Sequence, residues 1–180
     1  VEPDLLGRTT ARVRFAPLTK IEAEIIAGWR YVPPYDVYNL PPGEESVAEL
    51  IAGDYFSMWT ASENLVGFFC TGEAARVPTG ASVYGQMAEG SVIDFGLGMD
   101  PALTGQGAGT VFVKTALRFA HEARRMTGKG PLVRLTVAAF NTRARRVYEK
   151  LGFVEQGKFL GPGLSHMEFI VMIQPKTSPQ

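Results

Sequence analysis

The chain has 180 residues, of which 46% are hydrophobic, and both values are typical of one folded domain rather than of a disordered chain. Its 18 basic and 18 acidic residues cancel, which argues against nucleic acid or an anionic membrane as a partner bound through net charge. One cysteine excludes an internal disulfide and a metal site made of several thiolates, and two histidines leave little for a histidine-based metal site. The longest apolar runs are far shorter than a membrane span.

The first half of the chain begins with a strand and a helix. Residues 11–18 alternate between apolar and polar side chains as a strand does. Thr19 and Glu22 form a capping box that opens a helix, and Ser46 with Glu49 predicts a second, short helix in the same way. The apolar face of the first helix is predicted to carry Ile21, Ile25 and Trp29.

The middle of the chain predicts a hairpin, a loop and a further strand. Residues 54–61 and 64–75 are rich in aromatic and β-branched side chains and are expected to pair as antiparallel strands. A polar, glycine-rich loop is expected over residues 76–90, and a strand over residues 91–99.

The second half adds two helices and three strands. A long amphipathic helix follows the strand that ends at residue 99, and residues 130–140 form the next strand. Asn141 is the predicted N-cap of the last helix, with Gly152 at its C-terminal stop. Residues 153–160 and 166–174 complete the strands. The fold class is α/β (α+β), a single domain with a mixed sheet.

Three glycines lie between a predicted strand and the start of the long helix. Gly105, Gly107 and Gly109 leave the main chain bare where a helix N-terminus presents unpaired N–H groups, an arrangement that suits phosphate oxygens. A P-loop would need a lysine directly after the last glycine, and a dinucleotide fingerprint would need a glycine at position 110, where Thr110 stands. Close packing of the helix on the sheet is the alternative reason for these glycines.

The preceding strand contains two more glycines, Gly96 and Gly98. A glycine inside a strand weakens it and often marks a bulge or the close approach of another backbone-like group. A ligand arm along this strand, with its phosphate end at the helix start, would explain both groups of glycines.

Two blocks of this sequence resemble the GCN5-related N-acetyltransferase (GNAT) family. The stretch "GMDPALTGQGAGTVFV" is similar to the family's acetyl-CoA motif, Q/R-x-x-G-x-G/A, although Thr104 stands where the motif has Gln or Arg. The stretch "NTRARRVYEKLGF" is similar to the family's second block, and the two blocks have the family's spacing of one helix and one strand. The resemblance implies a mostly antiparallel sheet with about four helices and a central splayed strand pair, in one domain over residues 1–180 with loose termini at 1–9 and 175–180.

The resemblance also implies how acetyl-CoA binds. The pantetheine arm would pair with the backbone of Leu97, Gly98 and Met99 like an added strand, and Asn141 would contact that arm. Tyr148 would lie near the sulfur. The diphosphate would bind along Thr104, Gly105, Gln106, Gly107, Ala108, Gly109 and Thr110.

The implied reaction is acyl transfer from a thioester to an amine, which needs a base for the amine and an acid for the leaving thiolate. Tyr148 matches the family's position for the acid, although from its spacing alone it could simply complete the apolar stripe of its helix. Asp94, an acid in an apolar strand, is the candidate base, with a structural carboxylate as an equal alternative. Some family members carry glutamate in the following strand, where this chain has Thr136.

Residues 31–43 contain four prolines and cannot form a regular helix. Residues 76–90 are one candidate wall of the acceptor site, and residues 29–39, which lie where the family has its variable substrate loop, are the other. Aromatic rings and one carboxylate could hold a cationic acceptor there. The alternative is a loop whose rings only cover the sheet. The candidate acceptor residues are Trp29, Tyr31, Tyr35, Asp36 and Tyr38.

The function that the resemblance implies is an acetyl-CoA-dependent N-acetyltransferase that transfers the acetyl group by direct attack of a primary amine of a small molecule or peptide, without a metal. An acyl-CoA-binding or sensor module without turnover is the alternative, and an unrelated nucleotide-binding protein is a third. We find no signal peptide and expect a cytoplasmic protein with no membrane or nucleic-acid partner. A homodimer is possible, because exposed strand edges often pair.

Overall fold

The structure is a computed structural model that describes residues 13–86, 92–125, 132–161 and 167–174. The termini that were predicted to be loose, residues 1–9 and 175–180, lie outside the described residues, and so does the end of the predicted loop, residues 87–90.

The strands follow the predicted mixed pattern. They are β1 (Arg14–Pro17), β2 (Tyr55–Trp59), β3 (Leu65–Thr71), β4 (Val92–Met99), β5 (Leu132–Ala138), β6 (Val154–Leu160) and β7 (Glu168–Gln174). Their hydrogen-bonded order is β1-β2-β3-β4-β5-β7-β6. Pairs β1–β2, β2–β3, β5–β7 and β6–β7 are antiparallel and β4–β5 is parallel. The prediction of a mixed, mostly antiparallel sheet is therefore confirmed.

The described residues contain five α-helices, where about four were predicted: α1 (Lys20–Ala27), α2 (Glu44–Ala52), α3 (Ala81–Tyr84), α4 (Gly109–Arg125) and α5 (Thr142–Lys150). The additional helix, α3, follows a 3-10 turn (Pro78–Gly80) in the segment that was expected to be a loop. The loop prediction was wrong here because Val83 and Tyr84 are buried in a cluster with Val171 of β7, which holds this short segment in place.

Two compact units share the chain, and neither is one continuous segment. The first contains Val1–Cys70 with Leu97–Thr115, and the second contains Thr71–Gly96 with Ala116–Gln180. Strand β4 and helix α4 each contribute one part to each unit. Whether the chain behaves as the predicted single domain stays a prediction.

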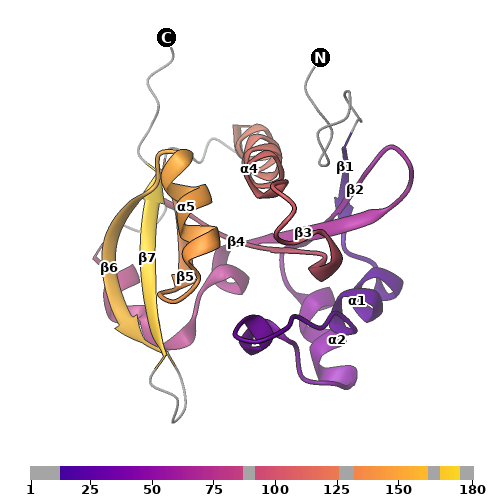
Figure 1. The fold of residues 1–180 in the computed structure, drawn as a ribbon, viewed down its shortest axis with the longest axis horizontal. Helices are drawn as coiled ribbons and strands as arrows, with labels where there is room; N and C mark the ends of the chain where they lie inside the picture. The colour runs from indigo at the N-terminus through magenta and orange to yellow at the C-terminus, as the bar shows by residue number, and fades with distance from the viewer. Residues whose placement is uncertain (1–12, 87–91, 126–131, 162–166, 175–180) are drawn as a thin grey trace. The chain divides into compact units, whose positions relative to one another are not determined.

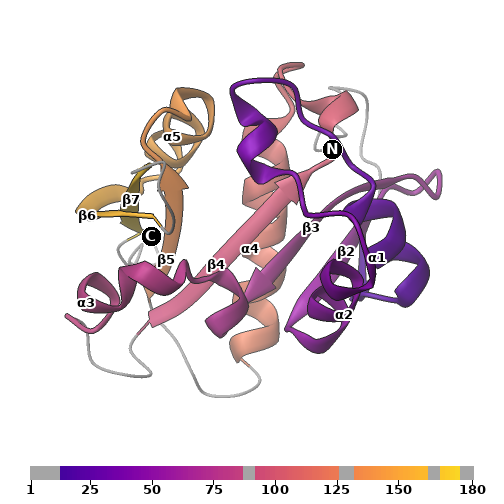
Figure 2. The ribbon, with the colours of Figure 1, turned by 90° about the horizontal axis from the view of Figure 1, so that it is seen from below.

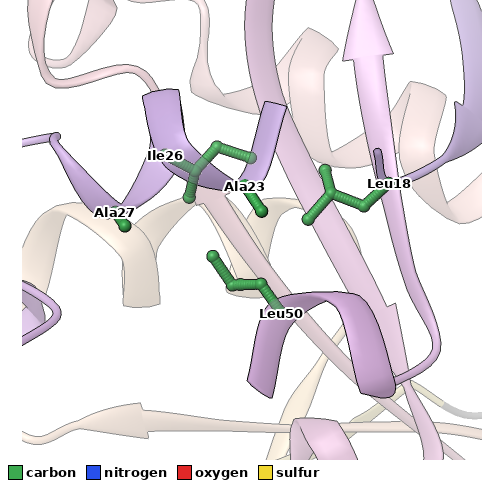
Figure 3. Close-up of a cluster of buried hydrophobic side chains, with 5 residues drawn as sticks. All are labelled: Leu18, Ala23, Ile26, Ala27 and Leu50. Carbon is green, nitrogen blue, oxygen red and sulfur yellow. The ribbon is translucent and has the colours of Figure 1, made fainter. Parts of the chain in front are cut away.

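The first unit has a buried apolar cluster where α1 meets α2. The two helices lie side by side in both ribbon views (Figures 1 and 2). Trp29 packs against this cluster from the end of α1, as the helical pattern predicted. Cys70, in β3, is buried. Figure 3 shows the buried cluster, which consists of Leu18, Ala23, Ile26, Ala27 and Leu50.

The face of α1 that was predicted to be apolar is only partly buried. Ile21 is 70% exposed and Ile25 is 45% exposed, so the prediction was wrong for these two residues. The reason is Glu22, whose carboxylate accepts hydrogen bonds from the Thr19 amide and hydroxyl, both at 2.6 Å, and from Trp59 Nε1 at 2.7 Å. The predicted capping box is thus confirmed, and its buried glutamate turns its own side of the helix inward.

Helix α2 begins earlier than predicted. Its N-cap is Gly43, with φ of 130°, and the expected second capping box at Ser46 is not formed. Ser46 lies inside the helix, where its hydroxyl donates a hydrogen bond to Pro41 O at 2.7 Å. The serine therefore fastens the helix to the preceding proline segment instead of capping it.

The second unit contains the parallel pair β4–β5. Its register covers three positions, from Val92 opposite Leu132 to Asp94 opposite Arg134. Within the described residues the pairing stops there, although β4 continues to Met99 and β5 to Ala138. A short parallel pairing, after which β4 and β5 no longer pair with each other, agrees with the predicted splayed pair.

Candidate functional site

The residues predicted to bind a diphosphate form a turn in the first unit, residues 104–110, which we call the glycine turn. It joins a 3-10 turn at Pro101–Leu103 to the start of α4. Asp100 Oδ1 accepts from the Ala102 amide at 2.8 Å, and the side chains of Thr104 and Gln106 donate to Pro101 O at 2.9 Å and Ala102 O at 2.5 Å. The side chains of Thr104 and Gln106 thus fold back onto the preceding segment and leave the main chain beside them uncovered.

Backbone conformation explains two of the three glycines in this turn. Gly105 has φ of 77° and Gly107 has φ of 84°, in the left-handed region that side chains disfavour. A Cβ added at Gly107 would meet no heavy atom within 4 Å. Close packing, the alternative reason considered for these glycines, therefore does not apply at Gly107.

The amides of the glycine turn are available to a ligand. Gly105, Gln106 and Gly107 are exposed. The first amide after Thr104 that donates to a described backbone acceptor is that of Phe112, to Ala108 O at 2.9 Å. The first turn of α4 contains no acidic residue that would compete with an anion. A run of N–H groups at the positive end of a helix dipole is a physical basis for anion binding.

The glycine in β4 that was expected to admit a ligand has a packing reason in the structure. A Cβ at Gly98 would lie 2.5 Å from the ring of Phe68, and a Cβ at Gly67 would overlap the ring of Phe112. Both are tight contacts within the first unit. Packing against Phe68 therefore explains why position 98 is glycine, and no ligand is needed to account for it. The predicted cofactor contact of Gly98 concerns its backbone alone.

The candidate acceptor residues differ in their surroundings. Trp29 stacks on Phe68, with ring centroids 6.1 Å apart, and belongs to the core. Tyr31 and Tyr38 meet edge to face at 6.4 Å. Asp36 is exposed in the 3-10 turn that Tyr35–Tyr38 forms. Among these candidates, the structure brings the rings of Tyr31 and Tyr38 together.

Tyr31 connects residues 31–43, which we call the proline-rich loop, to strand β4. Its hydroxyl donates a hydrogen bond to Met99 O at 2.7 Å. Burial, and then the charges of Asp100 and Tyr38, raise the pKa of Tyr31 well above its ordinary value, so the hydroxyl remains protonated and able to donate.

Asn39 closes the loop that Tyr31 begins. Its side-chain oxygen accepts from the Tyr31 amide at 2.7 Å, and its side-chain nitrogen donates to the Tyr31 carbonyl at 3.4 Å. The sequence analysis missed Asn39, because an asparagine among prolines predicts only a turn.

Asp94, the candidate base, is held by two arginines in what we call the arginine cluster, which consists of Arg76, Asp94 and Arg134. Asp94 is 4% exposed. Arg134 donates from Nε to Oδ1 at 2.6 Å and from Nη2 to Oδ2 at 3.0 Å, and Arg76 Nε donates to Oδ2 at 2.6 Å. Both carboxylate oxygens are engaged, which favours the structural alternative for this residue.

Both arginines of the arginine cluster were missed in the sequence. A signal was present, because Arg134 is a second charged residue inside an apolar strand and is the register partner of Asp94. Buried charges are usually paired, so two isolated opposite charges in two strands could have been matched. Arg76 gave no such signal in its polar segment.

Asn141 and Tyr148 lie in the second unit, on α5. Asn141 Oδ1 accepts from the Ala144 amide at 3.1 Å, which confirms the predicted N-cap. Gly152, with φ of 85°, follows the helix as the predicted stop. Tyr148 is buried, with its ring 5.9 Å from that of Phe153. These contacts are sufficient for structural roles of Asn141 and Tyr148. The roles of both residues toward a cofactor stay predictions.

The described residues also bear on a metal site and on a membrane span. They contain no group of three or more His, Cys, Asp or Glu side chains placed to hold a metal ion. None of the helices in the described ranges has the length and apolar character needed to cross a membrane.

The family model described as "Acetyltransferase (GNAT) family" matches residues 19–153. This range includes the glycine turn, the proline-rich loop and the block from Asn141 to Phe153. The chain therefore belongs to the GNAT acetyltransferase family, as its two motifs indicated. The comparison with curated proteins found no significant match.

Solved structures of similar fold include several acetyltransferases. A GNAT-family acetyltransferase from Bacillus anthracis has a TM-score of 0.65 at 13% identity, and the alignment covers 92% of this chain and 96% of that one. An inferred phosphinothricin N-acetyltransferase has a TM-score of 0.67 at 15% identity, with 93% and 100% covered. The spermidine/spermine N-acetyltransferase SpeG from Vibrio cholerae has a TM-score of 0.62 at 18% identity, with 91% and 92% covered. At these identities the likeness concerns the fold.

Proposed function

We propose that this protein transfers an acetyl group from acetyl-CoA to a primary amine of a small molecule or peptide. The observation that carries the proposal is the glycine turn, where positive φ angles at Gly105 and Gly107 expose a run of amides at the start of α4. Family membership supports an acyltransferase, and the names of structural neighbours that act on small amines support the acceptor class.

In this proposal the main chain of the first unit binds the cosubstrate. Amides of Thr104, Gly105, Gln106, Gly107, Ala108, Gly109 and Thr110 would hold the diphosphate. The backbone of Leu97, Gly98 and Met99 would pair with the pantetheine arm, because β4 is not paired with β5 beyond Asp94 in the described residues. Amides of that strand would also stabilise the oxyanion of the tetrahedral intermediate. Asn141 would contact the arm.

The attacking amine must be neutral, whereas a lysine-type amine has a pKa of about 10.4. Its proton therefore has to be removed, directly or through water. Because both oxygens of Asp94 already accept hydrogen bonds from guanidinium groups, we propose that Asp94 acts as the anchor of the arginine cluster. Tyr148 is proposed as the acid that protonates the leaving thiolate.

The acceptor is proposed to lie against the proline-rich loop. Tyr31 and Tyr38 offer ring faces, and exposed Asp36 offers a carboxylate for a cationic amine. Tyr35 remains a further candidate on the same 3-10 turn. Trp29 is a weaker candidate because its ring is stacked in the core. A cytoplasmic location and a homodimer remain parts of the proposal.

A second function is an acyl-CoA-binding module without turnover. It is favoured by one observation, namely that both carboxylate oxygens of Asp94, the candidate base, accept hydrogen bonds from arginines. Thioester consumption measured with a panel of primary amines separates the two. We expect release of free CoA that depends on the amine. Tight binding of CoA without amine-dependent release would support the binding module instead.

A further inference from the structure

The arginine cluster carries more positive than negative charge. It joins one carboxylate, that of Asp94, to two guanidinium groups. From this cluster we infer that Arg76 binds an anionic group of the acceptor, so that the acceptor is an amine that also carries an oxyanion, as an amino acid does. The inference rests on the proposed function and narrows its substrate class.

Arg134 is the structural member of the cluster. It is 3% exposed. Its Nε and Nη2 donate to Asp94, and its Nη1 donates to Tyr84 O at 2.8 Å. All three of its nitrogens are therefore engaged, and one buried guanidinium already neutralises the buried carboxylate.

Arg76 is placed differently. Its side chain is 41% exposed, and its Nε is the only one of its nitrogens that donates to another described residue. A guanidinium has five N–H donors, so four remain for a ligand on the exposed part of the side chain. The two terminal nitrogens present a planar fork that matches the two oxygens of a carboxylate or phosphonate.

Tyr84 fixes the segment that carries Arg76. Its ring is buried, and the guanidinium of Arg76 lies 5.9 Å from the ring centroid. Its hydroxyl accepts from the Val77 amide at 3.1 Å and is hydrogen-bonded to Thr136 Oγ1 at 2.8 Å. Arg76, directly before Val77, is therefore anchored through its own Nε and through its neighbour. An anchored guanidinium loses less conformational entropy when a ligand binds than a free surface arginine does.

The arginine cluster is attached to the strand that the proposed function uses. Asp94 belongs to β4 and precedes Leu97, the first residue proposed to pair with the pantetheine arm, by three residues. An anion bound by Arg76 would thus be bound by a side chain that is hydrogen-bonded to Asp94 of this strand. The ammonium end of such an acceptor would be the group that is acetylated.

The test compares acceptors that differ only in their anion. Thioester consumption is measured with 2-phenylethylamine, L-phenylalanine and the aminophosphonate analogue of phenylalanine, and with a matched leucine series. The variants are Arg76→Ala, Arg76→Lys and, as a control, Arg14→Ala, which removes an exposed ion pair with Glu63 in the first unit. Asp94 keeps Arg134 in both Arg76 variants, so each should fold, and a thermal melt checks this.

We expect the wild type to prefer one of the two anionic acceptors over the plain amine in at least one series. Arg76→Ala should lower kcat/KM for that acceptor by about tenfold to a hundredfold and for the plain amine by less than about threefold. Arg76→Lys should recover little, because an ammonium lacks the fork. The control should match wild type. The carboxylate and phosphonate arms show which oxyanion is preferred.

Three results would overturn the inference. One is a preference for the plain amine in every series, and another is an equal loss on all acceptors. The third is weaker CoA binding by Arg76→Ala in calorimetry, since Arg76 would then serve a phosphate of the cosubstrate. If no amine is acetylated at all, the proposed function fails separately. Calorimetric titration of CoA-loaded protein with the same three compounds then decides whether Arg76 selects the anion.

Discussion

The glycine turn and the arginine cluster use opposite parts of the polypeptide. In the glycine turn the side chains of Thr104 and Gln106 fold away and the main chain is exposed. In the arginine cluster, side chains from three different segments meet, and Asp94 and Arg134 are almost fully buried. The first arrangement suits any diphosphate, whereas the second is proposed to distinguish one acceptor from another. We expect substitutions in the two regions to separate cosubstrate binding from stability and acceptor choice.

Loss of Arg134 should have the largest effect. Arg134→Ala leaves the buried carboxylate with one partly exposed partner and should lower the free energy of unfolding by about 3–5 kcal/mol. Urea denaturation measures this loss. The double variant Asp94→Leu with Arg134→Leu should recover much of the stability, because neither charge is left alone. A loss below about 1 kcal/mol in the single variant would show that the pair is not structural.

Loss of the Tyr148 hydroxyl tests the proposed acid. Tyr148→Phe keeps the buried ring and its contact with Phe153, and should lower kcat by about a hundredfold with little change in CoA affinity. Stopped assays of CoA release and calorimetry with CoA provide the two measurements. Tyr55→Phe, a hydroxyl deletion on β2 in the first unit, serves as the control. Unchanged turnover in Tyr148→Phe would show that Tyr148 is not the acid. The remaining interpretation would be that Tyr148 only completes the apolar stripe of its helix.

A side chain at Gly107 tests the glycine turn. Gly107→Val should cost about 1–2 kcal/mol of stability from strain at positive φ, without any clash, and should weaken CoA binding by tenfold or more. Gly72→Val is a matched control, because Gly72 also has positive φ, at 70°, and an open Cβ position outside the turn. Equal loss of CoA affinity in both variants would attribute the effect to strain alone.

The Tyr31 hydroxyl should have the smallest effect. Tyr31→Phe removes one hydrogen bond to Met99 O and should lower stability by about 1 kcal/mol and raise the acceptor KM severalfold. The pKa of Tyr31 is raised on folding, so its contribution is complete below the unfolded pKa, about 10, and is lost as pH rises toward the folded value. The stability difference between wild type and variant should therefore narrow above about pH 10. A difference that widens there would contradict the direction of the shift.

The backbone conformation of the glycine turn was largely predictable from the sequence, and the arginine cluster was not. Gly105 and Gly107 signal their backbone conformation within a few residues, and Asn141 and Gly152 signal a cap and a stop in the same local way. The arginine cluster joins residues 18 and 40 positions apart, so its formation depends on strand register and not on a local pattern. Ile21 and Ile25 illustrate a related limit, because hydrophobic spacing could not reveal that buried Glu22 would turn α1.

The central claim is that the amides of the glycine turn bind the diphosphate of coenzyme A. Titration of isotopically labelled protein with CoA, followed by the amide resonances of Gly105, Gly107 and Gly109, tests it most directly. We predict that these resonances move together, in the direction of stronger hydrogen bonds, along one saturable curve. Binding of CoA that leaves all three unmoved, or the absence of binding, would contradict it.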